Sequence, residues 1–444
     1  MSRTSRVARA GLAILALFLA PCRSLWAGAP GFAEFQRKAE AGERLNVVFF
    51  GASLTWGANA SDPQLTSYRA CIGQRLQSAY PAAHFTFWDA AIGGTNSQLG
   101  VFRFQRDVLR RKPDLVFLDF SANDDINSAT PETLASYESL VRRIIVDSRA
   151  PVVQVIFPFQ WDVARGTTDG MLRRDAHLAI ANAYQAAVGD AIGLAQERVR
   201  SGKITIKQIW PVDGVHPCDE GYELFADAAW DAFRQAVAAK VVCSVPETML
   251  HAPTYMANTR ARLAAFDSLP RGWRMAKPRV VSAYFDMLMS RWLDDVAIAS
   301  NRPAAAGSSE TAPSGLAPPA PLRVRFRGSM VMLFGESTPE SGKYRVLLDG
   351  EVVRRKSPDG KQSYPEFDAA AFAKRVGGNA YLVQVLAEGL DPEKEHLLEI
   401  EPVFADDVEQ ELRLESICVA GGRAEVNPVG PDSEARRVNR VPRQ

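Results

Sequence analysis

The order of apolar and polar residues predicts two kinds of architecture, one after the other. Between residues 45 and 240, short apolar runs typical of strands buried on both faces alternate with longer stretches of helical spacing. The expected strands are residues 45–50, 84–88, 115–120 and 152–157, and the expected helices are residues 67–79, 98–111 and 130–148. This alternating order predicts an α/β domain with a parallel sheet flanked by helices.

Beyond residue 321 the apolar positions recur with a period of two. Six such runs, separated by turn residues, lie at residues 322–327, 331–334, 344–348, 381–386, 396–400 and 412–419. Alternation of this kind is typical of strands with one face on a core and one face in solvent. The sequence therefore predicts a C-terminal antiparallel β-sandwich of roughly 100 residues.

The remaining segments complete the expected domain plan. We expect a signal peptide at 1–29, the α/β domain at 30–245, a helical or irregular connecting segment at 246–301, a Pro/Ala/Ser linker at 302–321, the sandwich at 322–424 and a disordered tail at 425–444. The aromatic and methionine residues between 273 and 292 give the connecting segment apolar surface to bury.

The first residues have the three-part pattern of a secretory signal peptide. Arg3, Arg6 and Arg9 precede an apolar run at 11–20, and small residues follow at 27–29. The run is too short for a stable membrane span. We therefore expect cleavage near residue 27 and export to the periplasm or beyond. Residues 19–22 resemble a lipoprotein box, but Pro21 stands where a small residue is expected, so anchoring at Cys22 is the less favoured alternative.

The composition limits the classes of partner and cofactor that we expect for this protein. The chain has 444 residues, 47% hydrophobic, and a net charge of +1; removing residues 1–29, with four Arg and no acid, leaves 48 basic and 51 acidic residues. This balance argues against a nucleic-acid partner. No CxxC pair and only five His argue against a metal centre, and we expect no cofactor. In an oxidising compartment, up to two disulfides can join Cys71, Cys218, Cys243 and Cys418.

Candidate catalytic residues follow three of the expected strands. Ser53 comes after the first strand, Gly94 after the second and Asn123 after the third, while Asp213 and His216 share a later loop. Because the carboxyl ends of parallel strands meet at one edge of a sheet, we expect these residues to converge.

Together they supply what acyl transfer through a serine needs. A serine hydroxyl requires a general base, here His216, and Asp213 can orient its ring. The backbone N–H groups of Ser53 and Gly94 and the amide of Asn123 are candidate oxyanion donors. Taken singly, each has a structural interpretation: a helix cap for Ser53, a surface turn for the Asp-x-x-His pair, and ordinary turns for Gly94 and Asn123. The other histidines, with no comparable neighbours, are His84, His177, His251 and His396.

Residues 51–55, 92–95, 121–124 and 213–217 resemble, in this order, the four blocks of the SGNH (GDSL-type) hydrolase superfamily. The resemblance covers residues 45 to about 240 and implies a flavodoxin-like fold. It implies that Ser53 is the nucleophile and an oxyanion donor, that Gly94 and Asn123 complete the oxyanion hole, and that His216 is the base oriented by Asp213. The chain departs from the blocks at four positions where we expect altered turn geometry: Ala52, Asp89, Ala91 and Ser121.

These features predict a secreted serine esterase that acts through an acyl-serine intermediate. The resemblance of the sandwich to β domains that accompany some SGNH acetylesterases favours O-acetyl groups on a polysaccharide or glycan as substrate. Candidate aromatic platforms for sugar rings are Trp56, Phe159, Trp161 and Trp210. A lipid or aryl esterase and a glycan O-acyltransferase with the same triad remain alternatives. A non-catalytic glycan-binding protein is an alternative of another class, favoured by Ala52; the oligomeric state stays open.

Overall fold

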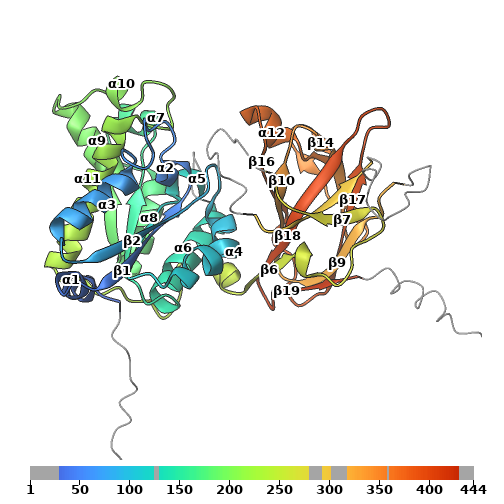
Figure 1. Ribbon diagram of the computed structural model, residues 1–444, viewed down its shortest axis with the longest axis horizontal. Coiled ribbons are helices and arrows are strands. Elements are labelled where there is room, and N and C mark those ends of the chain that lie inside the picture. Colours follow the sequence, from blue (N-terminus) through green and yellow to red (C-terminus); the bar gives the residue numbers. More distant parts are fainter. Residues whose placement is uncertain (1–29, 125–129, 280–292, 302–317, 358–359, 430–444) are drawn as a thin grey trace, which may run out of the picture.

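The computed structural model describes residues 30–124, 130–279, 293–301, 318–357 and 360–429. These residues form an α/β domain and a domain of packed sheets, which stand side by side in Figure 1. The expected signal peptide and most of the expected linker lie outside the described residues. None of the described helices is long and apolar enough to cross a membrane.

The first domain is built on a five-stranded parallel sheet with the strand order β2-β1-β3-β4-β5. The strands are β1 (Arg44–Gly51), β2 (His84–Ala91), β3 (Leu115–Leu118), β4 (Val152–Ile156) and β5 (Ala187–Asp190). The predicted α/β class and its first four strands are confirmed. Strand β5, which has four residues and includes Gly189, was not predicted from the sequence. A side chain at Gly189 would press against the backbone of Ala229, so close helix packing here requires glycine.

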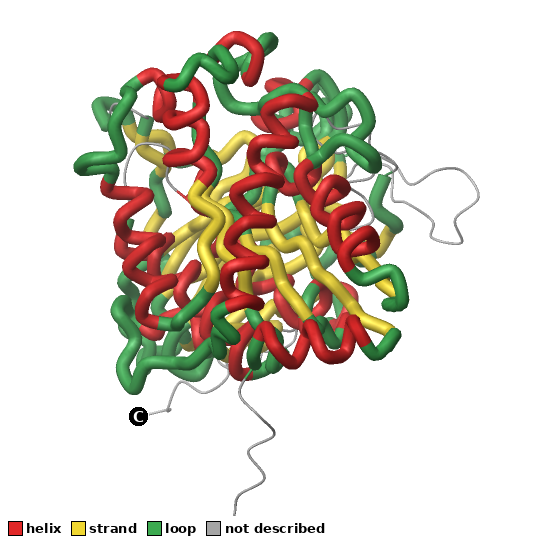
Figure 2. The backbone as a smooth tube through the Cα atoms, turned by 90° about the vertical axis from the view of Figure 1, so that its left-hand side faces the viewer, coloured by secondary structure: helices red, strands yellow, loops and turns green. Residues whose placement is uncertain are grey.

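Helices cover both faces of this sheet (Figure 2). On one side α11 (Asp219–Ala238) contacts α1 (Phe32–Glu40), α3 (Tyr68–Ala79) and α9 (Ala191–Arg200). On the other side α6 (Pro131–Val146) contacts α4 (Ser97–Asp107) and α8 (Leu172–Ala183). Side-chain caps set three of the starts: Ser67, Asn96 and Thr130 each accept a hydrogen bond from a backbone N–H of the first turn.

The second domain consists of two six-stranded antiparallel sheets that bury a common core. The first sheet contains β6 (Asn258–Arg262), β7 (Trp273–Ala276), β8 (Val296–Ser300), β10 (Met330–Ser337), β16 (Ala380–Ala387) and β18 (Glu411–Ala420). The second contains β9 (Leu322–Arg327), β11 (Lys343–Leu348), β12 (Glu351–Val352), β15 (Glu366–Asp368), β17 (His396–Val403) and β19 (Glu425–Pro428). The predicted antiparallel sandwich is confirmed.

The sandwich differs from the prediction at both of its ends. Residues 246–301, expected as a connecting segment, contribute β6, β7 and β8 to the first sheet, and residues 425–428 of the expected tail form β19 against β9. These strands are short, and their partners β18 and β9 lie far away in sequence, so no local period reveals them. The apolar residues expected to fill the connecting segment at 280–292 lie outside the described residues.

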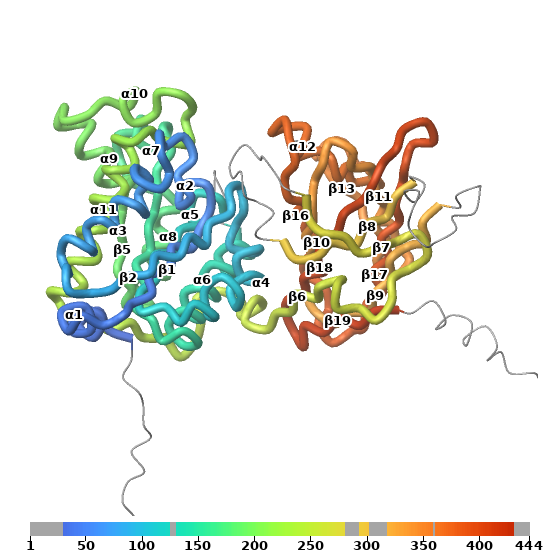
Figure 3. Tube along the Cα trace, viewed as in Figure 1, coloured from blue at the N-terminus to red at the C-terminus, as the bar shows by residue number. Residues whose placement is uncertain are grey.

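Strand β10 packs into both domains at once. Met330, Met332 and Phe334 belong to the core cluster of the α/β domain, whereas Val331 and Leu333 belong to the core between the two sheets. Successive side chains of a strand point to opposite faces, so one face of this sheet covers the sandwich core and the other covers the first domain. Figure 3 shows β10, β16 and β18 on the side of the sandwich that faces α4.

The four cysteines within the described residues are unpaired. Cys71, Cys218, Cys243 and Cys418 are free thiols, so the disulfides that the sequence allows are absent from the structure.

Candidate active site

The turn after β1 presents Ser53. The strand ends at Gly51, and Ser53 is the first residue of the short helix α2 (Ser53–Trp56). A Cβ atom at Gly51 would clash with the side chain of Thr55 and the backbone of Asp119, so this turn requires glycine. Ser53 is buried, with 4% of its surface exposed.

Ser53, His216 and Asp213 form a chain of contacts, in which the His216 ring lies within hydrogen-bonding distance of both other side chains. The Nε2 atom of His216 is 3.0 Å from the Ser53 Oγ atom. The Nδ1 atom of His216 is 3.3 Å from the Asp213 Oδ2 atom. The structure thus brings together three residues that are separated by up to 163 positions in the sequence. A serine, a histidine and a carboxylate in this order can transfer the serine proton to the imidazole.

The Asp213 carboxylate is held by several donors. Its Oδ1 atom accepts hydrogen bonds from the backbone N–H groups of Val215 and His216, both at 2.7 Å. The side-chain amide of Asn59 donates to its Oδ2 atom at 2.9 Å. Partial burial opposes the charged form, but these donors and the neighbouring His216 outweigh it and lower the pKa of Asp213. The carboxylate therefore stays ionised beside the imidazole.

Asn59 was not among the residues predicted from the sequence. Its amide also donates to the backbone oxygen of His216 at 3.3 Å, so it joins the Ser53 turn to the histidine loop. The only local signal is an Asn close to Gly57, and Asn59 does adopt the left-handed conformation, with φ of 68°.

Burial sets the charge state of His216. His216 is 6% exposed, and this burial lowers its pKa, although Asp213 acts in the opposite direction. The imidazole is therefore neutral at neutral pH and able to accept a proton.

Gly94 and Asn123 follow the two strands that flank β1. Gly94 lies in the turn after β2 with φ of +71°, and Asn123 lies in the short helix α5 (Ser121–Asp124) after β3. Both residues line the same cleft, of about 470 Å³. The Asn123 side chain makes no hydrogen bond to any described residue, so its amide is available to a ligand. This arrangement can offer N–H donors to an oxyanion.

The second domain forms the opposite wall of this cleft. The lining residues from the sandwich include Arg355, Asp368, Phe372, Arg375 and Tyr381. The two domains are joined there by direct hydrogen bonds. The Gln98 amide, on α4, contacts both Tyr255 and Glu388 at 2.7 Å.

Buried charges support the strand ends that carry the site. The Arg103 guanidinium, on α4, donates to the backbone oxygens of Gly51 and Ala90 and pairs with Asp107 at 3.1 Å. Burial lowers the pKa of Arg103 to about 10, so the group remains charged at neutral pH. This role was not predicted from the sequence, because Arg103 is one of several basic residues in a stretch of ordinary helical spacing.

Two aspartates hold the turns after β3. Asp119 accepts a hydrogen bond from the Thr55 hydroxyl at 3.0 Å, and complete burial raises its pKa to about 7. Asp124 accepts one from the backbone N–H of Ser97 at 2.7 Å. The Ser53 turn and the Gly94 turn are thereby both tied to the segment that carries Asn123.

The structure shows how the chain accommodates its departures from the SGNH blocks. Asp89 pairs with the buried Arg69 at 3.4 Å and accepts a hydrogen bond from the backbone N–H of Ala91 at 3.1 Å. Ala52 is fully buried behind Ser53. Ser121 begins α5, and its backbone oxygen accepts a hydrogen bond from Arg173. None of these substitutions displaces a member of the Ser53–His216–Asp213 group.

Of the four candidate aromatic platforms, Trp161 is the exposed one. Its ring is stacked on Phe159 with a centroid separation of 4.6 Å, and 45% of its surface is exposed. It also lies against the turn at Gly214, inside the loop between Asp213 and His216. Phe159 and Trp210 are buried, and Trp56 is half-buried.

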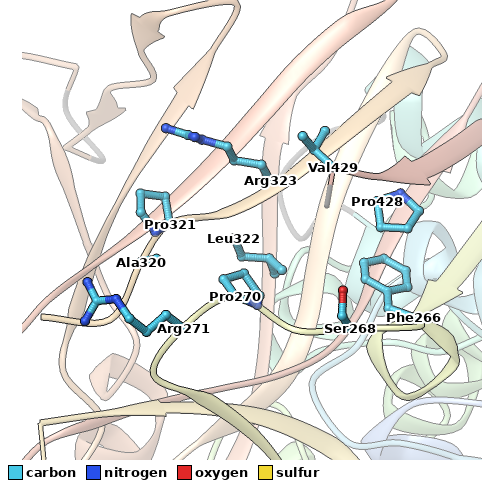
Figure 4. A pocket seen from close by; sticks show the side chains of 10 residues that line it. All are labelled: Phe266, Ser268, Pro270, Arg271, Ala320, Pro321, Leu322, Arg323, Pro428 and Val429. Carbon is cyan, nitrogen blue, oxygen red and sulfur yellow. The ribbon is translucent and has the colours of Figure 1, made fainter. Parts of the chain in front are cut away.

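A second hollow lies entirely on the sandwich (Figure 4). Its lining comes from residues 266–271, 320–323 and 428–429, so it contains none of the candidate catalytic residues. Within the described ranges, no cluster of three or more histidine, cysteine or acidic residues has the arrangement of a metal site.

Comparisons with known proteins agree with this fold. The GDSL-like lipase/acylhydrolase family matches residues 49–224. No curated protein sequence matches the chain. Among solved structures, a two-domain esterase active on acetylated mannans is similar, with 22% identity, a TM-score of 0.68, and coverage of 88% of this chain and 95% of that one. The same esterase crystallised with mannopentaose gives 21% identity and a TM-score of 0.65, covering 89% and 97% of the two chains.

A further match is an acetylxylan esterase from Geobacillus stearothermophilus, with 20% identity and a TM-score of 0.35. It covers 43% of this chain and 94% of its own length. The sequence match at 49–224 contains Ser53, Gly94, Asn123, Asp213 and His216. Residues 49–224, which make up most of the α/β domain, therefore match the GDSL-like lipase/acylhydrolase family.

Proposed function

We propose that the protein is a serine esterase that removes O-acetyl groups from a glycan through an acyl-serine intermediate. The observation that carries the proposal is the continuous contact from Ser53 Oγ through His216 to Asp213. The family match and the two-domain fold shared with an esterase of acetylated mannans support the same reaction class.

In the first step the Ser53 oxygen attacks the ester carbonyl while His216 Nε2 takes the hydroxyl proton. Asp213 holds the other ring nitrogen and stabilises the imidazolium that forms. The negative charge on the carbonyl oxygen is met by the backbone N–H groups of Ser53 and Gly94 and by the Asn123 amide.

The tetrahedral intermediate then breaks its bond to the sugar oxygen. His216 returns the proton to that oxygen, the sugar hydroxyl leaves, and the acetyl group stays on Ser53. A water molecule then loses a proton to His216 and attacks the acyl carbon. The bond from that carbon to the Ser53 oxygen breaks, His216 returns the proton to the serine oxygen, and acetic acid leaves and ionises to acetate in solvent. An acyl acceptor that outcompeted water at this stage would turn the same residues into a transferase.

Trp161 supports a carbohydrate as the leaving group. An exposed indole that is fixed by stacking on Phe159 offers a flat apolar surface next to the loop of His216. Sugar rings present apolar C–H faces that pack against such surfaces. A substrate outside the cytoplasm agrees with the export signal expected at residues 1–29.

The proposal is tested by acetate release from an aryl acetate and from acetylated mannan, with Ser53→Ala and His216→Ala beside the unchanged protein. We expect activity on both substrates and its loss in both variants. Matched controls are Ser201→Ala, which removes a surface hydroxyl bonded only to its own helix, and His84→Ala, an exposed residue of β2. The controls should retain full activity.

Other results have different meanings. Aryl acetate hydrolysis without release from the polymer would retain the serine mechanism and contradict the glycan substrate. Absence of both activities would contradict the esterase and favour a glycan-binding protein.

A further inference from the structure

The cleft beside Gly94 and Asn123 carries positive charge that no described residue neutralises in an ion pair. Arg355 and Arg375 both line it, and neither forms an ion pair with a described residue. The acidic residue in the lining, Asp368, pairs with Lys374 at 3.0 Å. Two guanidinium groups therefore face a space that adjoins Gly94 and Asn123.

Arg375 is held close to the oxyanion turn by an aromatic stack. Its guanidinium carbon lies 4.5 Å from the centre of the Phe372 ring. The same ring is 4.8 Å from the ring of Tyr381 and lies within 3.7 Å of the position that a Cβ at Gly94 would take. The cation is thus separated from the Gly94 turn by little more than one aromatic ring.

Arg355 approaches the cleft from a separate hairpin. It begins β13 (Arg355–Lys356), which pairs with β14 (Ser363–Tyr364), and its guanidinium lies 5.7 Å from the centre of the Tyr364 ring. Aromatic contacts restrict both arginine side chains without using their N–H donors. A planar guanidinium with free donors is suited to bidentate contact with a carboxylate or phosphate.

We propose that the cleft binds a negatively charged group, a carboxylate or a phosphate, on the alcohol part of the ester, next to the acetylated hydroxyl. The inference rests on the proposed esterase and adds the chemical class of the alcohol that leaves: an acidic sugar in preference to a neutral one. The arginines come from the sandwich, so this domain selects the substrate while the α/β domain performs the chemistry.

The test compares kcat/KM for three acetylated sugars: methyl galacturonoside, methyl galactoside 6-phosphate and the neutral methyl galactoside. We expect one or both anionic substrates to exceed the neutral one by about tenfold, with a preference that decreases as salt is added. The carboxylate and phosphate arms identify which group is bound. Arg355→Gln and Arg375→Gln should each reduce the preference for the anionic sugars over the neutral one.

Arg354→Gln is the matched control, because Arg354 is adjacent to Arg355 but bonds Ser363 instead of lining the cleft. Equal kcat/KM for all three sugars, or equal losses on neutral and anionic sugars in the variants, would overturn the proposal. Failure of the esterase itself would be distinct, since the unchanged protein would then release no acetate from the aryl ester.

Tyr381 of the sandwich contacts the turn that carries Gly94. This buried residue of β16 donates a hydrogen bond from its hydroxyl to the backbone oxygen of Gly93 at 2.7 Å. A Cβ atom at Gly94 would lie only 2.5 Å from the same hydroxyl. The peptide unit between Gly93 and Gly94 contains both the accepted hydrogen bond and the N–H group proposed as an oxyanion donor.

The geometry points to Tyr381 as a positioning residue, through which the sandwich orients the Gly94 N–H. Transition-state stabilisation depends on donors that are aimed before the reaction, so a released peptide unit should reduce kcat more than KM changes. This inference also rests on the proposed esterase.

Tyr381→Phe tests it, with Tyr344→Phe as the control. Tyr344 is another buried tyrosine of the sandwich, and its hydroxyl has no hydrogen-bond partner among the described residues. For Tyr381→Phe we expect kcat on aryl acetate to fall about tenfold with KM nearly unchanged, and for Tyr344→Phe no change in either constant. An unchanged kcat, or a rise of KM as the main effect, would contradict the positioning role; loss of activity in the control as well would show that the hydroxyls act only on folding.

Discussion

The two domains use buried strands in different ways. In the α/β domain, β3 is buried at every position, and the polar residues that follow each strand gather at one edge of the sheet. In the sandwich, β9 alternates between buried and half-buried residues, as expected for a sheet with one face on the core and one face toward solvent. The α/β domain thus places its polar candidate residues at strand ends, whereas the sandwich presents the faces of its sheets.

The sheet that contains β10 and β18 departs from this rule. Every residue of both strands is buried, because the face turned away from the sandwich core packs on the α/β domain. The comparison shows that the sandwich is not a separate appendage. It shares a core with the α/β domain and forms one wall of the cleft beside Asn123.

The largest effect is expected where the α/β domain is proposed to meet the reacting oxygen. Asn123→Ala should lower kcat on the order of 100- to 1000-fold with little change in KM, because one oxyanion donor is lost. Steady-state hydrolysis of an aryl acetate measures this. Asn182→Ala, an exposed residue of α8, is the control. A kcat within about twofold of the unchanged protein would remove Asn123 from the proposed machinery.

The shared core predicts joint unfolding of the two domains. Phe334→Ala should cost about 3–5 kcal/mol, because it empties a fully buried site between them. Calorimetry of the unchanged protein should show one unfolding transition. In the Phe334→Ala variant the whole transition should shift to a lower temperature. Val352→Ala, on an exposed edge strand, should leave it in place. Two separate transitions, of which only one responds to Phe334→Ala, would contradict the shared core.

A smaller effect is expected at the link between the Ser53 turn and the histidine loop. Asn59→Ala removes a donor to the Asp213 carboxylate and to the backbone oxygen of His216. We expect kcat/KM to fall about tenfold, since a hydrogen bond to a charged group is lost while the triad remains. Asn59→Asp would place a second carboxylate beside Asp213 and should be worse than alanine. Activity equal to that of the unchanged protein would argue against this positioning role.

The smallest effect is a displacement of the pH profile. His216 can act as a base only when neutral, and burial lowers its pKa below the ordinary value of about 6.5. The acid limb of kcat/KM should therefore lie below pH 6.5, with full activity retained at neutral pH. A limb centred above that value would show that the charge of Asp213 outweighs burial.

The sequence predicted the parts of the α/β domain that depend on local patterns. Four strands and the residues after them follow from apolar runs and small turn residues, as at Gly51 and Ser53. Asn59 and Arg103 escaped because their roles depend on contacts with the His216 loop and with two strand ends, which exist only in the folded chain. The catalytic roles of Ser53, His216, Asp213, Gly94 and Asn123 stay predictions.

In the sandwich, the two-residue period of the apolar positions located the strands but did not show what packs against each of their faces. Residues 330–334 are all apolar, at odd and even positions alike. This pattern indicates a strand that is covered on both faces, but it was not used in the prediction. Strands β6, β7 and β8 have mixed composition and were missed because pairing with β18 and with one another stabilises them. For the same reason, the contact of Tyr381 with Gly93, 288 residues away, leaves no trace in local sequence.

The central claim is that Ser53 is the nucleophile of a site activated by His216. It is tested most directly by treating the protein with a fluorophosphonate and mapping the modified peptide by mass spectrometry. The account predicts stoichiometric label on Ser53, lost in Ser53→Ala and strongly slowed in His216→Ala, with full labelling in Ser201→Ala. Label on another serine, or acetate release from a protein whose Ser53 stays unmodified, would contradict it.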